Sequence, residues 1–389
     1  MASGQFDRDA ARRNDANYLN SLKDSPNTSY ILVTARGEVA IKSDHVYGQA
    51  PYGGLTPPDL ATMEAEQLLE LSHAQVAQLP FSPQEPYYLG KYGEKSYLAL
   101  RVEAPGQQIS GEQAAGQAAG QAAGQAAGQV PGQQALGQQL EENWQHCFAP
   151  LRAVAGMLEP YQGELAAAAV ALATWDKNTK FCERCGASLK LACAGWEKHC
   201  SACAHITYPR TDPAIIVAIT DEAERLLLIH GATWQPGRYS VVAGFVEAGE
   251  SLEAAVGREA LEETGIKISQ ASYCSSQPWP FPRSLMFAFT ARADGQQEPK
   301  ADMQEVGHAF WVSREEFTQL VLEGKVIVPG RASSGHALVR AWYGRELPQP
   351  RIGPASALAA LSPRCARRAS GPSIPGTPKH TGHAKAQPG

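Results

Sequence analysis

The stretch "GFVEAGESLEAAVGREALEETGI", residues 244–266, places six glutamates and one arginine within 23 positions. Ser251 is a favoured N-cap residue and Gly265 stands where a left-handed residue closes a helix, so the stretch predicts a helix over 251–263. Glu259, Glu262 and Glu263 would then share one helix face, where like charges repel by about 0.2–0.5 kcal/mol per pair. A solvated acidic face is one explanation of this pattern. A bound cation with oxygen ligands, Mg²⁺ or Mn²⁺, is the other.

The whole stretch resembles the Nudix box, whose pattern is G, five residues, E, seven residues, then R-E-U-x-E-E-x-G-U with U apolar. Every required offset is filled, by Gly244, Glu250, Arg258, Glu259, Ala260, Glu262, Glu263, Gly265 and Ile266. The resemblance implies that the helix glutamates bind a divalent metal and that Arg258 orients them. It also implies a substrate in which a nucleoside diphosphate is linked to another group. Metal ions suit this chemistry because they neutralise the pyrophosphate charge and activate water.

Composition narrows the setting in which such a protein works. The chain has 389 residues and a formal net charge of −5, so it gives no electrostatic sign of non-specific nucleic-acid binding. No apolar run is long enough to cross a bilayer, and "MASGQFDRDAARR" lacks the apolar core of a secretory signal. We therefore expect a cytoplasmic protein with no membrane partner.

Four of the eight cysteines form two CxxC pairs separated by fourteen residues. They are Cys182, Cys185, Cys200 and Cys203. This spacing predicts a tetrahedral structural zinc site, closed by four thiolates and without an open position for catalysis. Cys193, His199 and His205 lie near enough in sequence to be substitute ligands, and free thiols or a redox pair are the weaker alternatives.

The pattern along the chain predicts an α/β protein of several domains. An N-terminal α/β domain (1–178) precedes a zinc ribbon (179–207), a Nudix hydrolase domain (208–345) and a disordered basic tail (346–389). In the first domain, "TSYILVTARGEVAIK" and "KSYLALRVE" predict strands, 63–76 an amphipathic helix, and 151–175 a helical pair broken near Pro160. A low-complexity insertion at about 106–139 contains QAAG repeats, whose glycines disfavour a helix.

The third domain is expected to be a Nudix α/β/α sandwich around a mixed sheet. "PAIIVAIT" and "ERLLLIHG" predict a hairpin, "YSVVAG" the strand before the acidic helix, and "SLMFAFTARA" a further strand. Ser313 and Glu316 form a capping-box pattern for a helix running toward Leu322.

The segment "SQPWPFPRS", residues 276–284, resembles the signature of the NADH pyrophosphatase (NAD(+) diphosphatase) branch of the Nudix family. Its prolines stiffen a turn that can hold Trp279 and Phe281 as flat faces for a base, and a buried corner is the structural alternative. The resemblance covers roughly residues 10–343. A serine at about 334, where the branch more often has isoleucine, is one departure.

This resemblance implies hydrolysis of the pyrophosphate of NADH or NAD⁺ to nicotinamide mononucleotide and AMP, and commonly a homodimer. The implied catalytic residues are Glu259, Glu262, Glu263, Glu305 and Arg258, and the four glutamates would hold Mg²⁺ or Mn²⁺. The implied substrate-binding residues are Phe245, Tyr208, Gln277, Trp279, Phe281 and Ser284. Removal of an NAD cap from RNA by the same cleavage is the first alternative. A non-catalytic zinc-ribbon nucleic-acid-binding protein is the second.

Overall fold

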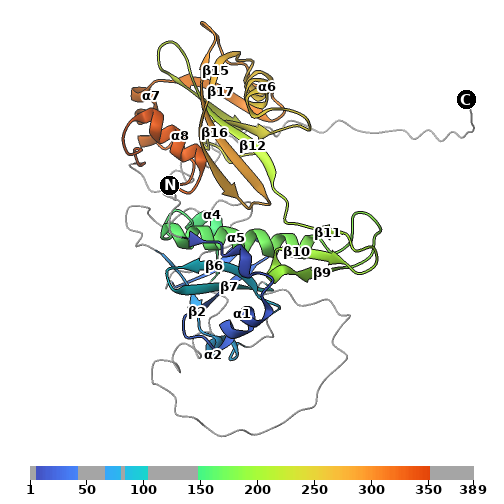
Figure 1. Cartoon of the computed structure of the whole chain (residues 1–389). Coiled ribbons are helices and arrows are strands. Elements are labelled where there is room, and N and C mark those ends of the chain that lie inside the picture. The colour runs from blue at the N-terminus through green and yellow to red at the C-terminus, as the bar shows by residue number, and fades with distance from the viewer. Residues whose placement is uncertain (1–5, 43–65, 80–83, 104–147, 351–389) are drawn as a thin grey trace, which may run out of the picture.

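Three β-sheets organise the protein, seen in a computed structural model that describes residues 6–42, 66–79, 84–103 and 148–350 (Figure 1). The low-complexity insertion lies outside the described residues, and so do Cys147, Cys365 and the tail beyond residue 350. Leu347, which belongs to the predicted tail, is 6% exposed and packs into the last core of the chain. We keep the predicted domain boundaries as a proposal, which the separate sheets support.

The first sheet has eight strands in the order β1-β6-β7-β2-β3-β4, with β5 paired to β2 and β8 to β3. The strands are β1 Phe6–Asp7, β2 Thr28–Thr34, β3 Glu38–Lys42, β4 Gln67–Leu68, β5 Glu70–Leu71, β6 Tyr87–Tyr92, β7 Lys95–Val102 and β8 Phe148–Pro150. Helix α5 (Pro160–Asn178) follows α4 (Leu151–Val154) and lays an alanine-rich buried face on the sheet. Helices α1 (Ala16–Ser21) and α2 (His73–Val76) lie on the other face.

The helix predicted over 63–76 is wrong for its described part. Residues 67–71 form β4 and β5, and only His73–Val76 is helical. The Leu69 N–H donates to the carbonyl of Ala40 at 2.9 Å, so an open sheet edge binds the segment as strand. Ser72 then starts the short helix with a capping box. Pairing of β4 with β3 and of β5 with β2 therefore outweighs the local helical pattern.

The second sheet is a small antiparallel ribbon in the order β11-β10-β9, which projects beside the first domain (Figure 1). Its strands are β9 Leu189–Ala192, β10 Glu197–Cys200 and β11 Ile206–Thr207. Trp196 donates its Nε1–H to the carbonyl of Tyr88 at 2.7 Å, and the buried Lys198 ammonium contacts Asp176 at 2.7 Å. These contacts fix the ribbon on the first domain.

The third sheet has six strands in the order β15-β16-β12-β13-β17, with β14 paired to β12. The strands are β12 Asp212–Thr220, β13 Leu226–Gly231, β14 Val242–Phe245, β15 Ile268–Trp279, β16 Ser284–Ala293 and β17 Val306–Val312. Strands β12 and β16 run parallel and the other pairs antiparallel, which confirms the mixed sheet.

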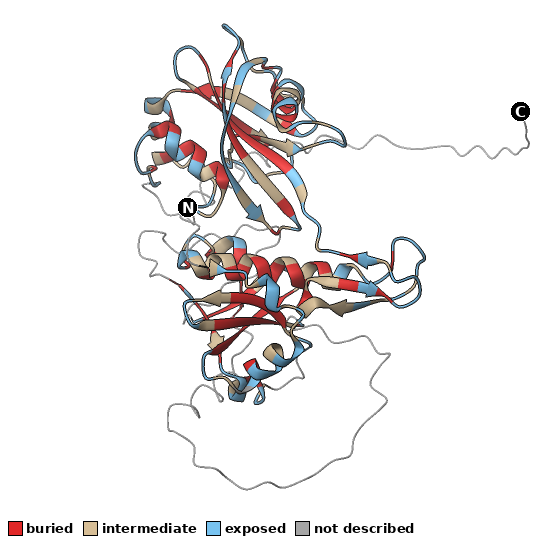
Figure 2. Ribbon diagram, viewed as in Figure 1, coloured by how far each residue is buried: buried red, intermediate tan, exposed pale blue. Residues whose placement is uncertain are grey.

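Helices cover both faces of this third sheet. Helix α6 (Leu252–Thr264) closes one core, while α7 (Arg314–Leu322) and α8 (Ser334–Tyr343) close the other. Figure 2 shows the buried residues gathered on the inner strands and on the helix faces turned toward them. The α/β/α sandwich and the Ser313–Glu316 capping box are thus confirmed. Among the described residues, no helix has both the length and the apolar character needed to cross a membrane.

Candidate active site

The acidic helix α6 begins and ends where its sequence predicts. The Ser251 hydroxyl accepts the Ala254 N–H at 3.2 Å, and Gly265 ends the helix with φ of 69° while its N–H donates to the Leu261 carbonyl. Ala255, Val256 and Ala260 turn toward the sheet and are fully buried. The charged residues of α6 therefore lie on the other sides of the helix.

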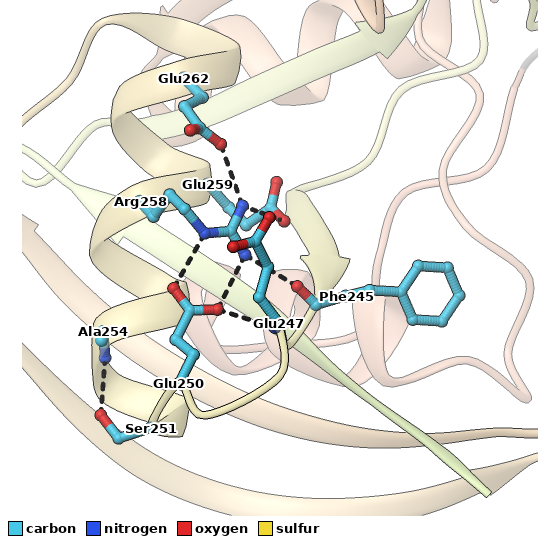
Figure 3. A network of polar contacts seen from close by, with 8 residues as sticks. All are labelled: Phe245, Glu247, Glu250, Ser251, Ala254, Arg258, Glu259 and Glu262. Carbon is cyan, nitrogen blue, oxygen red and sulfur yellow. Dashed lines mark hydrogen bonds and ion pairs between the residues drawn. The ribbon is translucent and has the colours of Figure 1, made fainter.

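Arg258 joins the acidic residues of the helix and of the loop before it (Figure 3). Its Nε donates to Glu250 at 2.9 Å, its Nη1 to Glu259 and Glu262 at 2.9 Å each, and its Nη2 to the Phe245 carbonyl at 2.8 Å. The Glu250 carboxylate contributes most to the raised pKa of this guanidinium. Arg258 thus contacts three glutamates at once, which is the geometry that the predicted orienting role requires.

Glu259 is held in a close approach between helix α6 and strand β14. Glu259 is 8% exposed, and a Cβ added at Gly244 would lie 2.0 Å from the Glu259 Cδ. Only glycine fits at position 244 without moving this carboxylate. Burial raises the pKa of Glu259, and its ion pair with Arg258 opposes that shift.

Glu263 is the most constrained acid of the helix. Glu263 is 6% exposed, and its buried Oε2 has no hydrogen-bond partner. Burial raises the pKa of its carboxyl to about 8. The neighbouring charges of Glu259 and Glu305, followed by those of Asp302 and Glu262, add to the shift. A buried acid with an unused oxygen among other carboxylates fits a divalent cation, which would supply the missing partner.

Glu262 and Glu305 flank this pair from more exposed positions. The Glu262 side chain is 59% exposed and bound to Arg258, while Glu305 lies in the loop before β17. The ligand oxygens of these carboxylates are not gathered as closely as those of a closed metal cage. Among the described residues, the cysteine sulfurs alone form a group of three or more His, Cys, Asp or Glu ligand atoms that all lie within 4.8 Å. Sequence reasoning missed Asp302, because a single loop aspartate carries no pattern.

The signature segment, residues 276–284, lies at the end of β15 and in the turn to β16. Gln277 has both ends of its amide engaged within the chain. Its Nε2 donates to the Ala332 carbonyl at 2.6 Å, and its Oε1 accepts from the Ser334 hydroxyl at 2.8 Å. Ser334 is therefore more than a packing replacement for isoleucine. Ser284 is 8% exposed and pairs with Trp279 across the β15–β16 ladder.

The two aromatic residues of the signature contact each other edge to face, with ring centroids 5.1 Å apart. Phe281 reaches across to the first domain, where a Cβ at Gly37 would lie 3.2 Å from its Cε1. It packs there against the core formed by α5 and the first sheet. Both rings are half-buried, and Phe281 takes the corner role as well because it packs on the first domain.

The other two predicted substrate residues present exposed rings. Phe245 is 58% exposed and Tyr208 51% exposed. In Figure 3 the Phe245 ring points away from the Arg258 network, although its carbonyl belongs to that network. Both rings are therefore accessible to a flat ligand group.

The four cysteines of the ribbon converge on one point. The Sγ atoms of Cys182 and Cys203 lie 3.7 Å apart, and those of Cys185 and Cys200 3.5 Å apart. Tetrahedral Zn²⁺ with Zn–S bonds of about 2.3 Å requires sulfurs about 3.8 Å apart. Backbone N–H groups of Cys203 and Ala202 lower the pKa of Cys200 to about 6. The substitute ligands are not part of this group, since His199 pairs with Glu197 and His205 with Glu183.

Comparison with known proteins decides what the third domain is. Residues 210–329 match the NUDIX domain family. They form a Nudix domain. The Nudix box and the α/β/α sandwich expected from the sequence are thereby confirmed.

Two curated relatives each match about half of this chain. The NAD-capped RNA hydrolase NudC of Mycobacterium bovis (strain BCG / Pasteur 1173P2) is 36% identical over 204 residues, 50% of this chain and 65% of that protein. The NAD-capped RNA hydrolase NUDT12 of Macaca fascicularis is 34% identical over 217 residues, 53% of this chain and 46% of that protein. The chain thus matches less than two thirds of the length of each relative. A solved NUDIX hydrolase from Nitrosomonas europaea is 18% identical over 44% of this chain and 97% of that one, with a TM-score of 0.34.

Proposed function

We propose that this protein is a hydrolase that cuts the pyrophosphate bond of NADH or NAD⁺, giving nicotinamide mononucleotide and AMP. The observation that carries the proposal is the buried Glu263 carboxyl, which has an unused oxygen beside Glu259 and near Glu305. Burying an ionised carboxylate in this way destabilises the fold unless a proton or a cation neutralises it, and a cation can bind several of these glutamates at once. The site therefore favours metal-dependent chemistry over a solvated acidic face.

The residues of the Nudix domain divide the work of such a site. Glu259, Glu262, Glu263 and Glu305 would hold Mg²⁺ or Mn²⁺. When bound, the cation supplies neutralisation of the pyrophosphate charge and acidification of water. Arg258 keeps Glu259 in place through its ion pair, and Glu262, which is now paired with Arg258, would be a ligand of the cation. The exposed Phe245 and Tyr208 rings and the half-buried Trp279 are the surfaces for the two bases.

The test is a comparison of kcat/KM for NADH, NAD⁺ and ADP-ribose in saturating Mg²⁺. Base stacking contributes about 1–3 kcal/mol, so a dinucleotide should be preferred over ADP-ribose by about 5-fold to 150-fold. Trp279→Ala should remove most of that preference and leave ADP-ribose hydrolysis nearly unchanged. Equal loss on both substrates would show that Trp279 maintains the fold and does not select the ligand.

Removal of an NAD cap from RNA is the second candidate, because both relatives named above are NAD-capped RNA hydrolases. The bond cut is the same and the substrate is larger. An NAD-capped RNA belongs in the same comparison. A preference of more than about tenfold, or 1.4 kcal/mol, for capped RNA over free dinucleotide would make decapping the main activity. Absence of metal-dependent cleavage of every substrate, with no AMP from the free dinucleotides and no nicotinamide mononucleotide from capped RNA, would favour the non-catalytic binding module.

We further propose that the ribbon cysteines hold one structural Zn²⁺ and that the protein is a homodimer acting in the cytoplasm. The open Tyr208 and Phe245 rings support the dimer, since a partner subunit can cover one face of a bound base. Sedimentation equilibrium with and without NAD⁺ tests it. The unpaired cysteines and the predicted zinc thiolates support a reducing compartment.

A further inference from the structure

Asp302 lies in the connection between β16 and β17, three residues before Glu305. Its Oδ1 accepts the N–H groups of Gln304 at 3.1 Å, Glu305 at 3.1 Å and Val306 at 2.8 Å. Its Oδ2 accepts the Glu305 N–H at 3.2 Å. One carboxylate thus accepts hydrogen bonds from three consecutive backbone N–H groups of the segment that carries Glu305.

The same segment is tied to its surroundings on two sides. The N–H of Asp302 donates to the Glu263 carbonyl at 3.2 Å, and the N–H of Lys300 donates to the Thr264 carbonyl at 2.8 Å. These are the free carbonyls at the end of helix α6. On the other side, the Glu305 carbonyl accepts the Ala232 N–H at 2.8 Å. The loop is therefore fastened to the helix that carries Glu259 and Glu263.

The backbone between these ties is held in an unfavourable conformation. Met303 has φ of 64°, in the left-handed region that costs a non-glycine residue about 1–2 kcal/mol. Its N–H donates to the Val306 carbonyl at 2.9 Å, which closes the turn. Such a turn persists when neighbouring contacts over-determine it, and the Asp302 carboxylate provides most of them.

The backbone of Glu305 is fixed by hydrogen bonds, whereas its side chain is exposed. The residue is exposed, and its charge contributes to the raised pKa of both Glu259 and Glu263, which places it near them. A carboxylate on a fixed backbone has less freedom to lose when it binds a cation. From these contacts we propose that Asp302 is a positioning residue, which presents Glu305 to a divalent cation without binding the cation itself. The inference rests on the proposed function only for the identity of the ligand.

The test is Mn²⁺ binding to the full chain, measured by electron paramagnetic resonance without substrate, so that it does not depend on turnover. Loss of an outer partner of a metal ligand costs about 10–100-fold in affinity, and we expect this loss for Asp302→Ala. Asp302→Asn keeps an acceptor oxygen for the backbone and should restore most of it. Asp294→Ala, an exposed aspartate of the same connection, is the matched control and should bind Mn²⁺ normally.

A double-mutant cycle separates positioning from direct binding. In a Glu305→Gln background, Asp302→Ala should add no further loss of Mn²⁺ affinity. Hydrogen exchange at the amides of residues 304–306 should also speed up in Asp302→Ala alone. Equal losses with and without Glu305 would overturn the inference, and so would an Asn variant as weak as the Ala variant. If wild-type protein binds Mn²⁺ but hydrolyses none of the dinucleotides, the proposed function fails while the positioning role stands.

Discussion

Two adjacent glutamates of α6 have opposite environments. The Glu262 side chain is 59% exposed and paired with Arg258, whereas Glu263 is 6% exposed and leaves Oε2 without a partner. The spacing of the acids along the helix predicts that they share a face. It cannot predict this difference, because burial depends on segments that are distant in sequence, such as the loop around Asp302, whose N–H binds the Glu263 carbonyl.

The first prediction concerns the protein without Mg²⁺ or Mn²⁺. The pKa of Glu263 is raised from 4.5 to about 8, so the folded protein keeps a proton that the unfolded chain releases. The free energy of unfolding should therefore fall as pH rises from about 4.5 to about 8, and this contribution should be flat above that range. Glu263→Gln should abolish this part of the pH dependence, as urea unfolding at several pH values would reveal. The buffers should contain no chelator, so that zinc is retained. Parallel pH profiles for the two proteins would contradict the assignment.

The second prediction concerns Gly244. A methyl group there would displace the Glu259 carboxylate, since its Cβ would lie 2.0 Å from Cδ. Misplacing a catalytic group by about 1 Å can cost on the order of 100-fold in rate, and we expect such a loss of kcat for Gly244→Ala. Gly257→Ala on α6 is the matched control, because its Cβ would meet nothing within 4 Å. Similar turnover of the two variants would argue against a role for Glu259.

At the scale of elements, the ribbon and helix α6 were the most predictable from sequence. Both depend on residues close together in the chain: two CxxC pairs, or a serine and a glycine at the helix ends. The helix prediction fails for the segment 67–71 because β3 and β2 pair with it as strands. The Gln277–Ser334 contact was equally out of reach, since 57 residues separate the partners and no local pattern links them.

The third prediction tests the ribbon. Cys185→Ser should lower zinc content and the melting temperature, because the binding energy of structural zinc contributes to folding. Cys193→Ser, at the residue directly after β9, offers a control outside the group of converging sulfurs. It should retain one zinc per chain by atomic absorption. If the purified wild-type protein contains no zinc, the structural zinc site is wrong.

At the scale of the whole molecule, the substrate signature is also part of the seam between domains. Phe281 packs on the Gly37 turn and the α5 core, while Gln277 binds the backbone of Ala332. The next residue toward the N-terminus, Arg331, lies against Gly156 of the first domain. A sequence motif shows which residues recur together, and it does not show that one ring faces a neighbouring domain.

The fourth prediction follows from this seam. Phe281→Ala should reduce the free energy of unfolding by about 2 kcal/mol, roughly half the cost of removing a fully buried phenylalanine. Calorimetry should show the Nudix domain melting separately from the first domain. Phe245→Ala removes an exposed ring and should leave stability unchanged while it weakens substrate binding. If Phe281→Ala melts as one unit at the wild-type temperature, the ring does not join the domains.

The position of Phe281 has a practical consequence for anyone who trims this protein. A fragment cut to begin at Tyr208 would keep every residue of the acidic site, yet it would expose the Phe281 ring and the backbone of Arg331 to water. Phe281 would lose its packing against the first domain. Trp279 packs on the Phe281 ring, so its position would also be less well fixed. Poor activity of such a fragment would then report a collapsed binding surface and would say nothing about the glutamates.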